Sequence, residues 1–391
     1  MEVLIATNRL ESFSGSEIIA LELAQEFASR GHRPLLLANS SSEDVADEAR
    51  DRGLELWSRE ELPRLSSFDL IWSQHLLFPL LLGDAPPSPF ASRPWIVFAH
   101  LGPSEPYETA FPIVEEILAD RVLANSPETR DQLVFEGLDP RRIDVFHNAA
   151  PAIFARSPRH RPESLRRLLV VNNNLPDDVS QALAVLRDQG LAITYIGAGG
   201  EKRRVQPDDL HRADAVVTIG KTVQYALRAG VPVFCYGQFG GPGWLDSTNF
   251  ARAEYFNFSG RCCRWKFGVG EIVKSLLEGW SRAAQFAERV CGEDPERFRL
   301  ELFVENLLAA AAARPVWEPA QCLALEQQWR QIMRLQRIAK AVRREVQAGH
   351  RYVTDIRRYS SALNRAEKLA TARLEALERL SAQMRRVSPE N

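Results

Sequence analysis

Two segments of the chain place small or polar residues at the start of a predicted helix. Gly15-Ser16 follows an apolar run over residues 2–7, and Gly220-Lys221-Thr222 follows the apolar run 216–219. The first turn of a helix carries unpaired backbone N–H groups and about half a positive charge, which suits a diphosphate. Because the second segment adds an ammonium and a hydroxyl, we predict that Lys221 anchors the diphosphate. The alternatives are a plain turn at Gly220 with a solvated Lys221, and helix–strand packing at Gly15.

Two histidines lie near the ends of predicted strands. His100 ends the apolar run 95–99, and His75 comes shortly after the run 68–72. Open α/β sheets bind ligands at the carboxyl ends of their strands, so both histidines are candidates for contact with a substrate. The alternative for His100 is a hydrogen-bonded core histidine, the more usual role of a single His after a run of apolar residues.

The segment 236–244 contains more glycine than an ordinary connection. Glycine permits positive φ and close approach of a ligand, so we predict that Gly240 and Gly241 contact the donor. The alternative is a structural turn packed by its own aromatic side chains. Arg261 is a candidate phosphate contact, as is the basic run 202–204, and for each the alternative is a solvated surface charge.

Strands and helices alternate along most of the chain. Apolar runs predict strands at residues 2–7, 34–38, 68–72, 95–98, 121–124, 143–146, 168–171, 192–196, 215–219 and 231–236. Helical periodicity predicts helices at residues 16–29, 178–189, 222–229, 270–284 and 295–313. This alternation predicts an α/β protein of two Rossmann-like domains with parallel, doubly wound sheets and a cleft between them. We place the N-terminal domain at 1–157, the second at 165–315 and a helical extension at 316–391.

Composition and missing motifs exclude several classes of protein. The net charge of −2 argues against a nucleic-acid partner, and no apolar stretch approaches the ~20 residues of a membrane span, so we expect a cytoplasmic protein. The five cysteines contain no C-x-x-C, so neither a disulfide framework nor a zinc site is indicated. There is also no D-x-D, Walker loop or G-x-G-x-x-G, and we expect neither a metal ion nor a cofactor.

Four segments in this order resemble one family. They are the helix opened by Gly15-Ser16-Glu17, the stretches LANSPETR (123–130) and IDVFHN (143–148), and ALRAGVPVF (226–234). Together they resemble GT-B glycosyltransferases, specifically the large retaining, glycosyltransferase family 4-like group, over roughly residues 1–313. The resemblance implies a hexosyltransferase that moves a sugar from a nucleotide diphosphate sugar, its co-substrate, to a glycan, a lipid-linked sugar or a protein. It further implies that the N-terminal domain binds the acceptor, where His75 is a candidate contact, and that His100 contacts the sugar near its reacting centre.

The predicted donor domain departs from the pattern of this family. Members usually carry two glutamates separated by seven residues, whereas no Glu occurs between Glu201 and Glu254, and Tyr225 stands at the second position. We keep Tyr225 as a candidate donor contact and expect the helix starts and Lys221 to stabilise the leaving diphosphate. The alternative functions are a nucleotide-sugar epimerase or hydrolase and a non-catalytic scaffold that recruits a partner enzyme.

The C-terminal extension has its own charge and periodicity. From residue 316 onward, 15 Lys and Arg stand against 8 Asp and Glu. Apolar residues recur every seven positions, at Ile356, Leu363, Ala370, Leu377 and Met384. The spacing predicts a coiled coil through residues 320–391 that joins copies of the chain or a partner helix. The positive charge also suits peripheral contact with the anionic inner face of a membrane, and the remaining alternative is a solvated helix.

Overall fold

The computed structural model describes residues 1–57, 65–75, 93–103, 108, 112–156, 163–293 and 296–312, together with single positions between 318 and 360. The chain divides into two compact units, Met1–Ile332 and Met333–Asn391. The first unit holds both sheets, and it is described here by itself.

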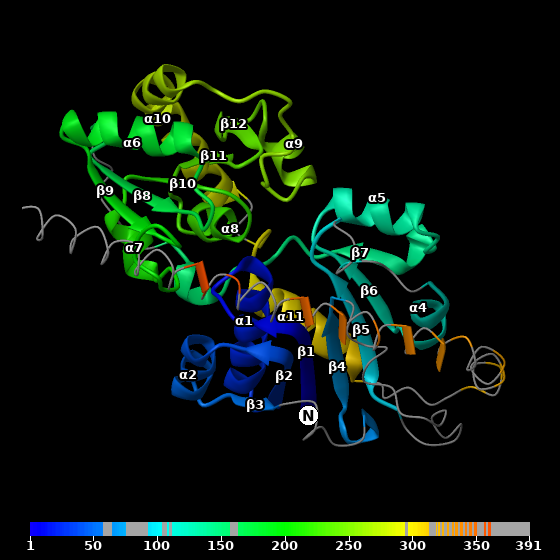
Figure 1. The fold of residues 1–391 in the computed structure, drawn as a ribbon. Coiled ribbons are helices and arrows are strands. Elements are labelled where there is room, and N and C mark those ends of the chain that lie inside the picture. The colour runs from blue at the N-terminus through cyan, green and yellow to red at the C-terminus, as the bar shows by residue number, and fades with distance from the viewer. Residues whose placement is uncertain are drawn as a thin grey trace, which may run out of the picture. The chain divides into compact units, whose positions relative to one another are not determined.

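The first sheet contains seven parallel strands in the order β3-β2-β1-β4-β5-β6-β7 (Figure 1). Its strands are β1 (Glu2–Leu10), β2 (Arg33–Ser41), β3 (Glu55–Trp57), β4 (Leu70–Gln74), β5 (Trp95–His100), β6 (Arg121–Ala124) and β7 (Ile143–Val145). Its helices are α1 (Gly15–Ser29), α2 (Glu43–Asp51), α4 (Pro112–Leu118) and α5 (Pro127–Phe135). Helices on both faces bury the central strands, and β4 and β5 are buried along their whole length.

The second sheet contains five strands in the order β12-β11-β10-β8-β9. Its strands are β8 (Arg167–Val171), β9 (Ala192–Ile196), β10 (Ala215–Thr218), β11 (Val233–Gly237) and β12 (Gly240–Trp244). Its helices are α6 (Asp177–Asp188), α7 (Pro207–Arg212), α8 (Lys221–Arg228), α9 (Phe250–Tyr255) and α10 (Val269–Glu293). The two sheets confirm the predicted α/β fold class of two Rossmann-like halves. The second sheet is parallel except at its edge, where β12 pairs antiparallel with β11.

The antiparallel pair explains the glycine-rich segment. A Cβ atom at Gly241 would lie 2.1 Å from the carbonyl oxygen of Cys235, so only glycine permits this close strand pairing. Gly240 has a φ of +84°, and a Cβ atom there would lie 2.8 Å from the carbonyl oxygen of Trp265. The glycines are therefore required by the packing of a tight hairpin.

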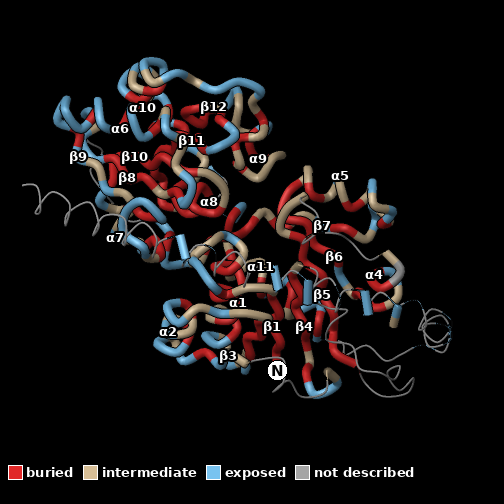
Figure 2. Tube along the Cα trace, in the orientation of Figure 1, coloured by how far each residue is buried: buried red, intermediate tan, exposed pale blue. Residues whose placement is uncertain are grey.

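The last helix of the first unit returns to the first sheet. In α11 (Leu300–Ala311), the buried residues Leu300, Val304 and Leu307 belong to the same core as α1 and the first sheet. Figure 2 shows that the chain is buried along the strands of both sheets. Residues 165–315 thus supply the second sheet and also one helix of the first core, a return that periodicity alone does not reveal.

The predicted coiled coil lies almost entirely outside the described residues. Positions described from 320 to 360 are helical, and Ile356 is described and exposed, but the other four residues of the seven-residue repeat fall on undescribed positions. Among the described residues, no helix combines the length and the apolar character that a membrane span requires. The assembly and membrane roles of residues 320–391 stay predictions.

Candidate functional site

A cavity of about 860 Å³ lies between the two sheets, at the carboxyl ends of strands from both. It is lined by the starts of α1 and α8, by residues 172–174 after β8, and by residues 202–204 after β9. A Cβ atom built on Gly15 would lie 3.7 Å from the Cβ atom of Lys221. The two helix starts singled out by sequence therefore lie side by side in the wall of one cavity, with Ser16 and Thr222 also lining it.

A carboxylate already occupies the start of α1. The buried Glu17 side chain accepts hydrogen bonds from the backbone N–H groups of Glu11, Ser12 and Ser14, at 3.1, 3.0 and 3.2 Å. This acceptor shapes the loop before α1 and places a negative charge near the helix N-terminus. A second anion is therefore less favoured at Gly15 and Ser16 than the glycine loop alone suggests.

The start of α8 has no such acceptor. Gly220 precedes the helix with a φ of +61° and a ψ of −132°, a conformation that residues with a Cβ atom rarely adopt. Its N–H donates to the carbonyl of Phe258 at 3.0 Å, which fixes the turn. The first turn of α8 contains no acidic side chain. Of the two helix starts, α8 is the better anion site.

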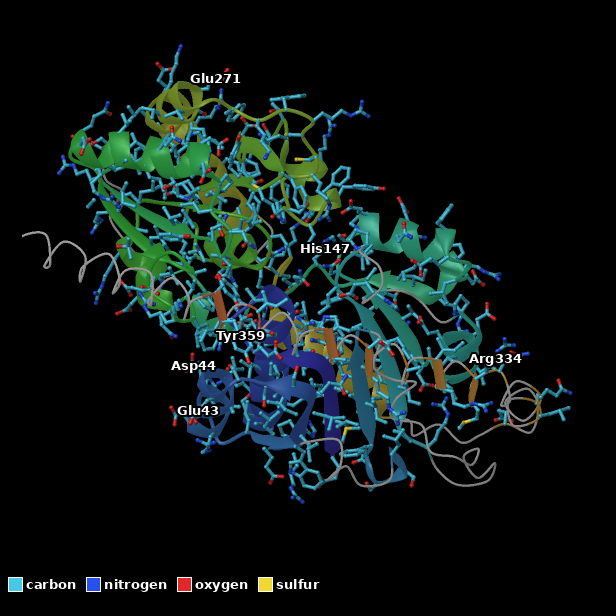
Figure 3. All side chains as sticks on the ribbon, viewed as in Figure 1. Glu43, Asp44, His147, Glu271, Arg334 and Tyr359 are labelled. Atoms are coloured by element: carbon cyan, nitrogen blue, oxygen red, sulfur yellow. The ribbon has the colours of Figure 1, made fainter. Side chains whose placement is uncertain are left out.

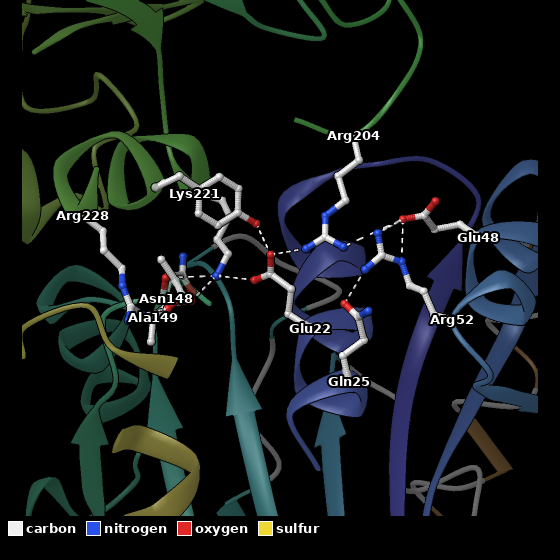
Figure 4. Close-up of polar contacts among 11 residues, drawn as sticks. Glu22, Gln25, Glu48, Arg52, Asn148, Ala149, Arg204, Lys221 and Arg228 are labelled. Atoms are coloured by element: carbon white, nitrogen blue, oxygen red, sulfur yellow. Dashed lines mark hydrogen bonds and ion pairs between the residues drawn. The ribbon is translucent and has the colours of Figure 1, made fainter. Parts of the chain in front are cut away.

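Lys221 lies in a buried charged cluster between the two sheets, and we call this cluster the Glu22 cluster (Figure 4). It consists of Glu22 in α1 together with Arg204, Lys221 and Tyr225. The Lys221 Nζ lies 2.9 Å from Glu22 Oε2 and donates to the carbonyls of Asn148, at 3.1 Å, and Ala149. Burial lowers the pKa of Lys221, and the Glu22 carboxylate opposes that shift. The ammonium is therefore held by one carboxylate and two carbonyl groups of the protein.

Tyr225, the second predicted donor contact in α8, belongs to the same cluster. Its hydroxyl donates to Glu22, and its ring stacks on Phe154 with the centroids 4.0 Å apart. Burial raises the pKa of this hydroxyl well above its ordinary value. Tyr225 and Lys221 line the cavity, yet their polar atoms join the first half of the unit to the second. The sequence analysis missed Glu22, although an acidic residue between Leu21 and Leu23 in a buried helix was a usable signal.

The basic run after β9 contributes three differently placed cations. Arg204 is buried against Glu22, and Arg203 donates to Asp209 at 2.7 and 2.8 Å and to Glu201 at 2.7 Å. Lys202 is exposed and lines the cavity, and within the described part of the chain it makes no hydrogen bond or ion pair. Lys202 is therefore the cation of this run that is available to a ligand.

A second cavity, of about 710 Å³, lies over the carboxyl ends of β1, β4 and β5. His75, Glu108 and Arg261 line it. The His75 Nε2 lies 3.5 Å from Glu108 Oε1, and the backbone N–H of Asn8 donates to His75 Nδ1 at 3.3 Å. Burial lowers the pKa of His75 to about 4 and raises the pKa of Glu108 to about 7. Sequence reasoning found His75 but missed Glu108, which lies in no recognisable motif.

His100 lies beneath this second cavity and lines neither cavity. Its Nδ1 lies 3.1 Å from the carbonyl oxygen of Glu108, and its Nε2 lies 3.2 Å from Glu115 Oε2. Burial works to lower the pKa of His100, but Glu115 and Glu108 together outweigh it and the pKa is raised. The geometry matches the hydrogen-bonded core histidine that the sequence left open, and direct sugar contact by His100 stays a prediction.

The remaining predicted residues divide between the cavity walls and the core. Arg261 lines the second cavity, and its guanidinium pairs with Glu128 at the start of α5, with Nε 3.1 Å from Oε1. Gly240 and Gly241 line neither cavity, because they form the β12 edge of the second sheet. His147, labelled in Figure 3, has its Nδ1 3.7 Å from Glu254 of α9. No group of three or more His, Cys, Asp or Glu within the described ranges is arranged to hold a metal ion.

Comparison with known proteins identifies the first half of the unit. Residues 13–152 match the model of Glycosyltransferase Family 4, and this stretch contains α1, His75, His100 and Glu108. None of the curated proteins matches the chain by sequence.

Solved structures extend the likeness to both sheets. Anabaena HepE in complex with UDP-glucose matches with a TM-score of 0.50 at 15% identity, over 80% of this chain and 99% of that one. A Listeria monocytogenes protein assigned as a UDP-N-acetylglucosamine 2-epimerase matches with a TM-score of 0.50 at 13% identity, over 80% and 98%. These likenesses concern the fold, which glycosyltransferases and epimerases share. The match of residues 13–152 and the two-sheet fold together indicate a glycosyltransferase of GT-B architecture.

Proposed function

We propose that this glycosyltransferase takes its sugar from a nucleotide diphosphate sugar whose diphosphate binds at the start of α8. The supporting observation is that two helix starts lie side by side in the wall of a cavity of about 860 Å³. UDP-glucose, which is bound in the Anabaena HepE complex, is a nucleotide sugar of the same class. We expect no cofactor or metal ion, with the nucleotide sugar as co-substrate.

The proposed catalytic contribution of the α8 start is electrostatic. When the bond between the sugar and the diphosphate breaks, negative charge grows on the departing oxygen. Fixed N–H dipoles at a helix start stabilise that charge without reorganisation. The exposed Lys202 adds a mobile cation at the opposite wall, whereas Lys221 would first have to leave Glu22 and two carbonyls. We therefore assign the direct cation contact to Lys202 and keep Lys221 as a candidate.

The second cavity is the proposed acceptor site. It adjoins the first cavity, since both are lined by Ser14, Leu101 and Gly220, and it lies over the stretch that matches the family 4 model. A glycan, a lipid-linked sugar or a protein hydroxyl are the acceptor classes that the family resemblance suggests. We also propose that the transfer retains the configuration of the sugar at its anomeric carbon. For the extension over residues 320–391 we propose peripheral contact with the inner face of a membrane and self-association.

Protection against thermal unfolding tests the donor class. A ligand that binds only the folded protein stabilises it by RT ln(1 + [L]/Kd), so the true donor raises the Tm in proportion to its occupancy. The panel contains UDP, UDP-glucose, other UDP-, GDP- and dTDP-sugars, and glucose alone. We expect one nucleotide series to raise the Tm and glucose alone to leave it unchanged.

A lysine pair sharpens this test. Lys202→Ala should weaken binding of the protecting nucleotide roughly tenfold, about 1.5 kcal/mol, by loss of one charge-assisted hydrogen bond. Lys274→Ala, an equivalent change on the exposed face of α10, should leave the affinity unchanged. Equal affinities for both variants would exclude Lys202, and a panel without any protecting nucleotide would contradict the proposed function.

A further inference from the structure

We propose that the acceptor presents a sugar ring to the second cavity, where the Glu108 carboxylate, positioned by His75, binds a ring hydroxyl beside the reacting one. The inference rests on the proposed function, because it takes the first cavity as the donor site and the second as the acceptor site. It narrows the acceptor to a glycan or a lipid-linked sugar, and it makes Glu108 a residue that selects the acceptor.

The wall of the second cavity is hydrophilic. Among the residues that line it, Leu101, Pro103 and Ile219 have apolar side chains, and the others are glycines or polar and charged residues. Its volume of about 710 Å³ lies in the range of cavities that enclose small molecules. An alkyl chain that displaced water from this wall would leave its polar groups without partners, whereas the hydroxyls of a sugar replace that water. The wall therefore favours a polyhydroxyl acceptor over a lipid alcohol.

Glu108 lies where the two cavities meet. Its side chain lines both of them, although only 9% of it is exposed. Glu11 is the other acidic residue that lines both cavities, and it is exposed to solvent. The reacting hydroxyl of an acceptor in the second cavity has to point into the first. A hydroxyl next to it on the same ring then lies at the junction, beside Glu108.

The carboxylate of Glu108 is held from two sides. One oxygen, Oε2, accepts the backbone N–H of Leu101 at 2.9 Å. The other oxygen, Oε1, faces the His75 Nε2 at 3.5 Å. Because His75 Nδ1 accepts the N–H of Asn8, the proton of the neutral ring sits on Nε2 and points at Glu108. A carboxylate has about four acceptor positions, so these two donors orient it and leave the others free for hydroxyl groups.

The backbone at His75 supports a positioning role. His75 follows the end of β4 with a φ of +61°, in the left-handed region that residues with a Cβ atom adopt infrequently. Beyond the end of β4 the ring meets β1, where the Asn8 N–H and the Thr7 hydroxyl, at 3.2 Å, contact Nδ1. Such strain is retained where the surrounding structure fixes it, and it accumulates at functional sites.

The surroundings leave the Glu108 carboxylate without a cationic partner. Within the described ranges it pairs with no lysine or arginine, and burial raises its pKa to about 7. Burial and the nearby His100, which Glu115 backs, lower the pKa of His75 to about 4, so that His75 is neutral. The other charged residues that line the second cavity are Arg9, Glu11, Glu17 and Arg261. Hydroxyl donors from a sugar would stabilise the ionised form of Glu108, which burial disfavours.

This role is compatible with the proposed retention of configuration. Glu108 neither bonds to the anomeric carbon nor takes the proton of the reacting hydroxyl, so it places no requirement on the face from which the acceptor attacks. The hydroxyl that it binds keeps its proton before and after the transfer. Because this contact is equal in the ground state and the transition state, its loss should raise KM for the acceptor and leave kcat unchanged.

The test compares variants of the full chain. Glu108→Gln keeps an oxygen for the Leu101 N–H but removes the charge, and Glu108→Asp, which keeps the carboxylate, takes its place if Glu108→Gln does not fold. His75→Asn removes the contact with Glu108, while asparagine tolerates positive φ. Glu116→Gln is the matched control, since Glu116 is exposed on α4 and lines neither cavity. Thermal protection by the donor shows that each variant is folded.

Release of the nucleotide from UDP-glucose, or from the best-protecting donor, is measured with a panel of acceptors. The sugar acceptors are the octyl glycosides of glucose, galactose and mannose, followed by the monodeoxy analogues of the best of them. The acceptors with a lone hydroxyl are octan-1-ol and the blocked peptide Gly-Ser-Gly. We expect one glycoside to exceed both of these by at least about 10²-fold in kcat/KM, a difference typical of a site built to hydrogen-bond a substrate hydroxyl.

Glu108→Gln should bind the donor like the wild type and raise KM for that glycoside about 10- to 100-fold, with kcat unchanged. One monodeoxy analogue should show a similar loss with the wild type. With Glu108→Gln the same analogue should lose less than about twofold more, since its missing hydroxyl no longer has a partner. Glu116→Gln should match the wild type throughout.

The pH dependence of KM separates positioning by His75 from a merely structural role. Hydroxyl groups donate to the ionised carboxylate, so the wild-type KM for the glycoside should rise as the pH falls below about 7, and this rise should be absent in Glu108→Gln. In His75→Asn the rise should begin at higher pH, because the carboxylate loses a hydrogen-bond donor and its pKa increases further.

Three results would overturn the assignment. If the lone-hydroxyl acceptors match or exceed every glycoside, or if no glycoside accepts the sugar, the acceptor is not recognised as a sugar. If Glu108→Gln keeps the wild-type KM for the glycoside, Glu108 does not bind the acceptor. If the variant loses affinity for UDP-glucose but not for UDP, Glu108 contacts the donor sugar instead. Failure of the proposed function has a different signature, namely a wild-type protein that no nucleotide sugar protects.

Discussion

Lys221 shows how the surroundings of a single residue change its expected role. From the sequence we predict a diphosphate anchor, so that Lys221→Ala weakens nucleotide-sugar binding by about 1.5–3 kcal/mol and leaves the fold intact. In the structure, 5% of the Lys221 side chain and 1% of the Glu22 side chain are exposed, and the two form an ion pair. Removal of one partner of a buried pair leaves an uncompensated charge.

The structure therefore predicts a loss of stability at this residue. Lys221→Met should lower the free energy of unfolding by about 3 kcal/mol, because Arg204 and Tyr225 only partly replace the ammonium beside Glu22. Urea denaturation measures this change. Lys202→Met, at an exposed position, is the control and should stay within about 0.5 kcal/mol of the wild type. A stable Lys221→Met protein that no longer binds the donor would restore the anchor role.

Helix α11 shows that an element can belong to a core far from its neighbours in sequence. It follows the second sheet along the chain, yet Leu307 is 5% exposed in the core formed by α1 and the first sheet. Truncation of a buried leucine removes transfer free energy and leaves a cavity.

A substitution in α11 tests this packing. Leu307→Ala should lower the free energy of unfolding by about 2–5 kcal/mol. Asn306→Ala, on the exposed side of the same helix, should change it by less than about 0.5 kcal/mol. Chemical denaturation of both proteins gives the comparison. Equal stabilities would place α11 outside the core of the first sheet.

At the scale of the whole molecule, several buried contacts join the two sheets. The Glu22 cluster connects α1 with α8, and Arg228 of α8 pairs with Glu301 of α11, with one nitrogen–oxygen distance of 2.9 Å. Ala150 and Phe298, on either side of the second sheet in sequence, are joined by a backbone hydrogen bond of 2.7 Å. These contacts lie within one compact unit, Met1–Ile332.

This coupling predicts that both sheets unfold together. The slowest-exchanging amides of β4 and of β10 should report the same free energy in native-state hydrogen exchange, since a shared core opens as one cooperative unit. A protecting nucleotide should raise both values equally. Two clearly different free energies would show that the halves unfold independently.

The sequence by itself determined the regular elements and the helix starts of the first cavity. Strands β1, β4, β5 and β8 are apolar runs, and α1 has helical periodicity with glycine on either side, so local chemistry sufficed. It passed over several short elements, among them α2, which buries only Val45 and Ala49, and β3, which has three residues. That the starts of α1 and α8 would line one cavity was predictable, because the carboxyl ends of parallel strands meet at one edge of a sheet.

Tertiary structure alone decided which side chains meet. Glu22 and Tyr225 are 203 residues apart in sequence, yet they are in contact. Lys221, which the sequence presents as a diphosphate anchor or a solvated cation, joins them in a buried cluster. Glu108 gains its partner His75 and its raised pKa from burial where β1, β4 and β5 end. Periodicity reports which face of an element is apolar, but it carries no information on partners from distant segments. Desolvation and charge pairing depend on those partners, so the roles of Lys221 and Glu108 became visible only in the folded chain.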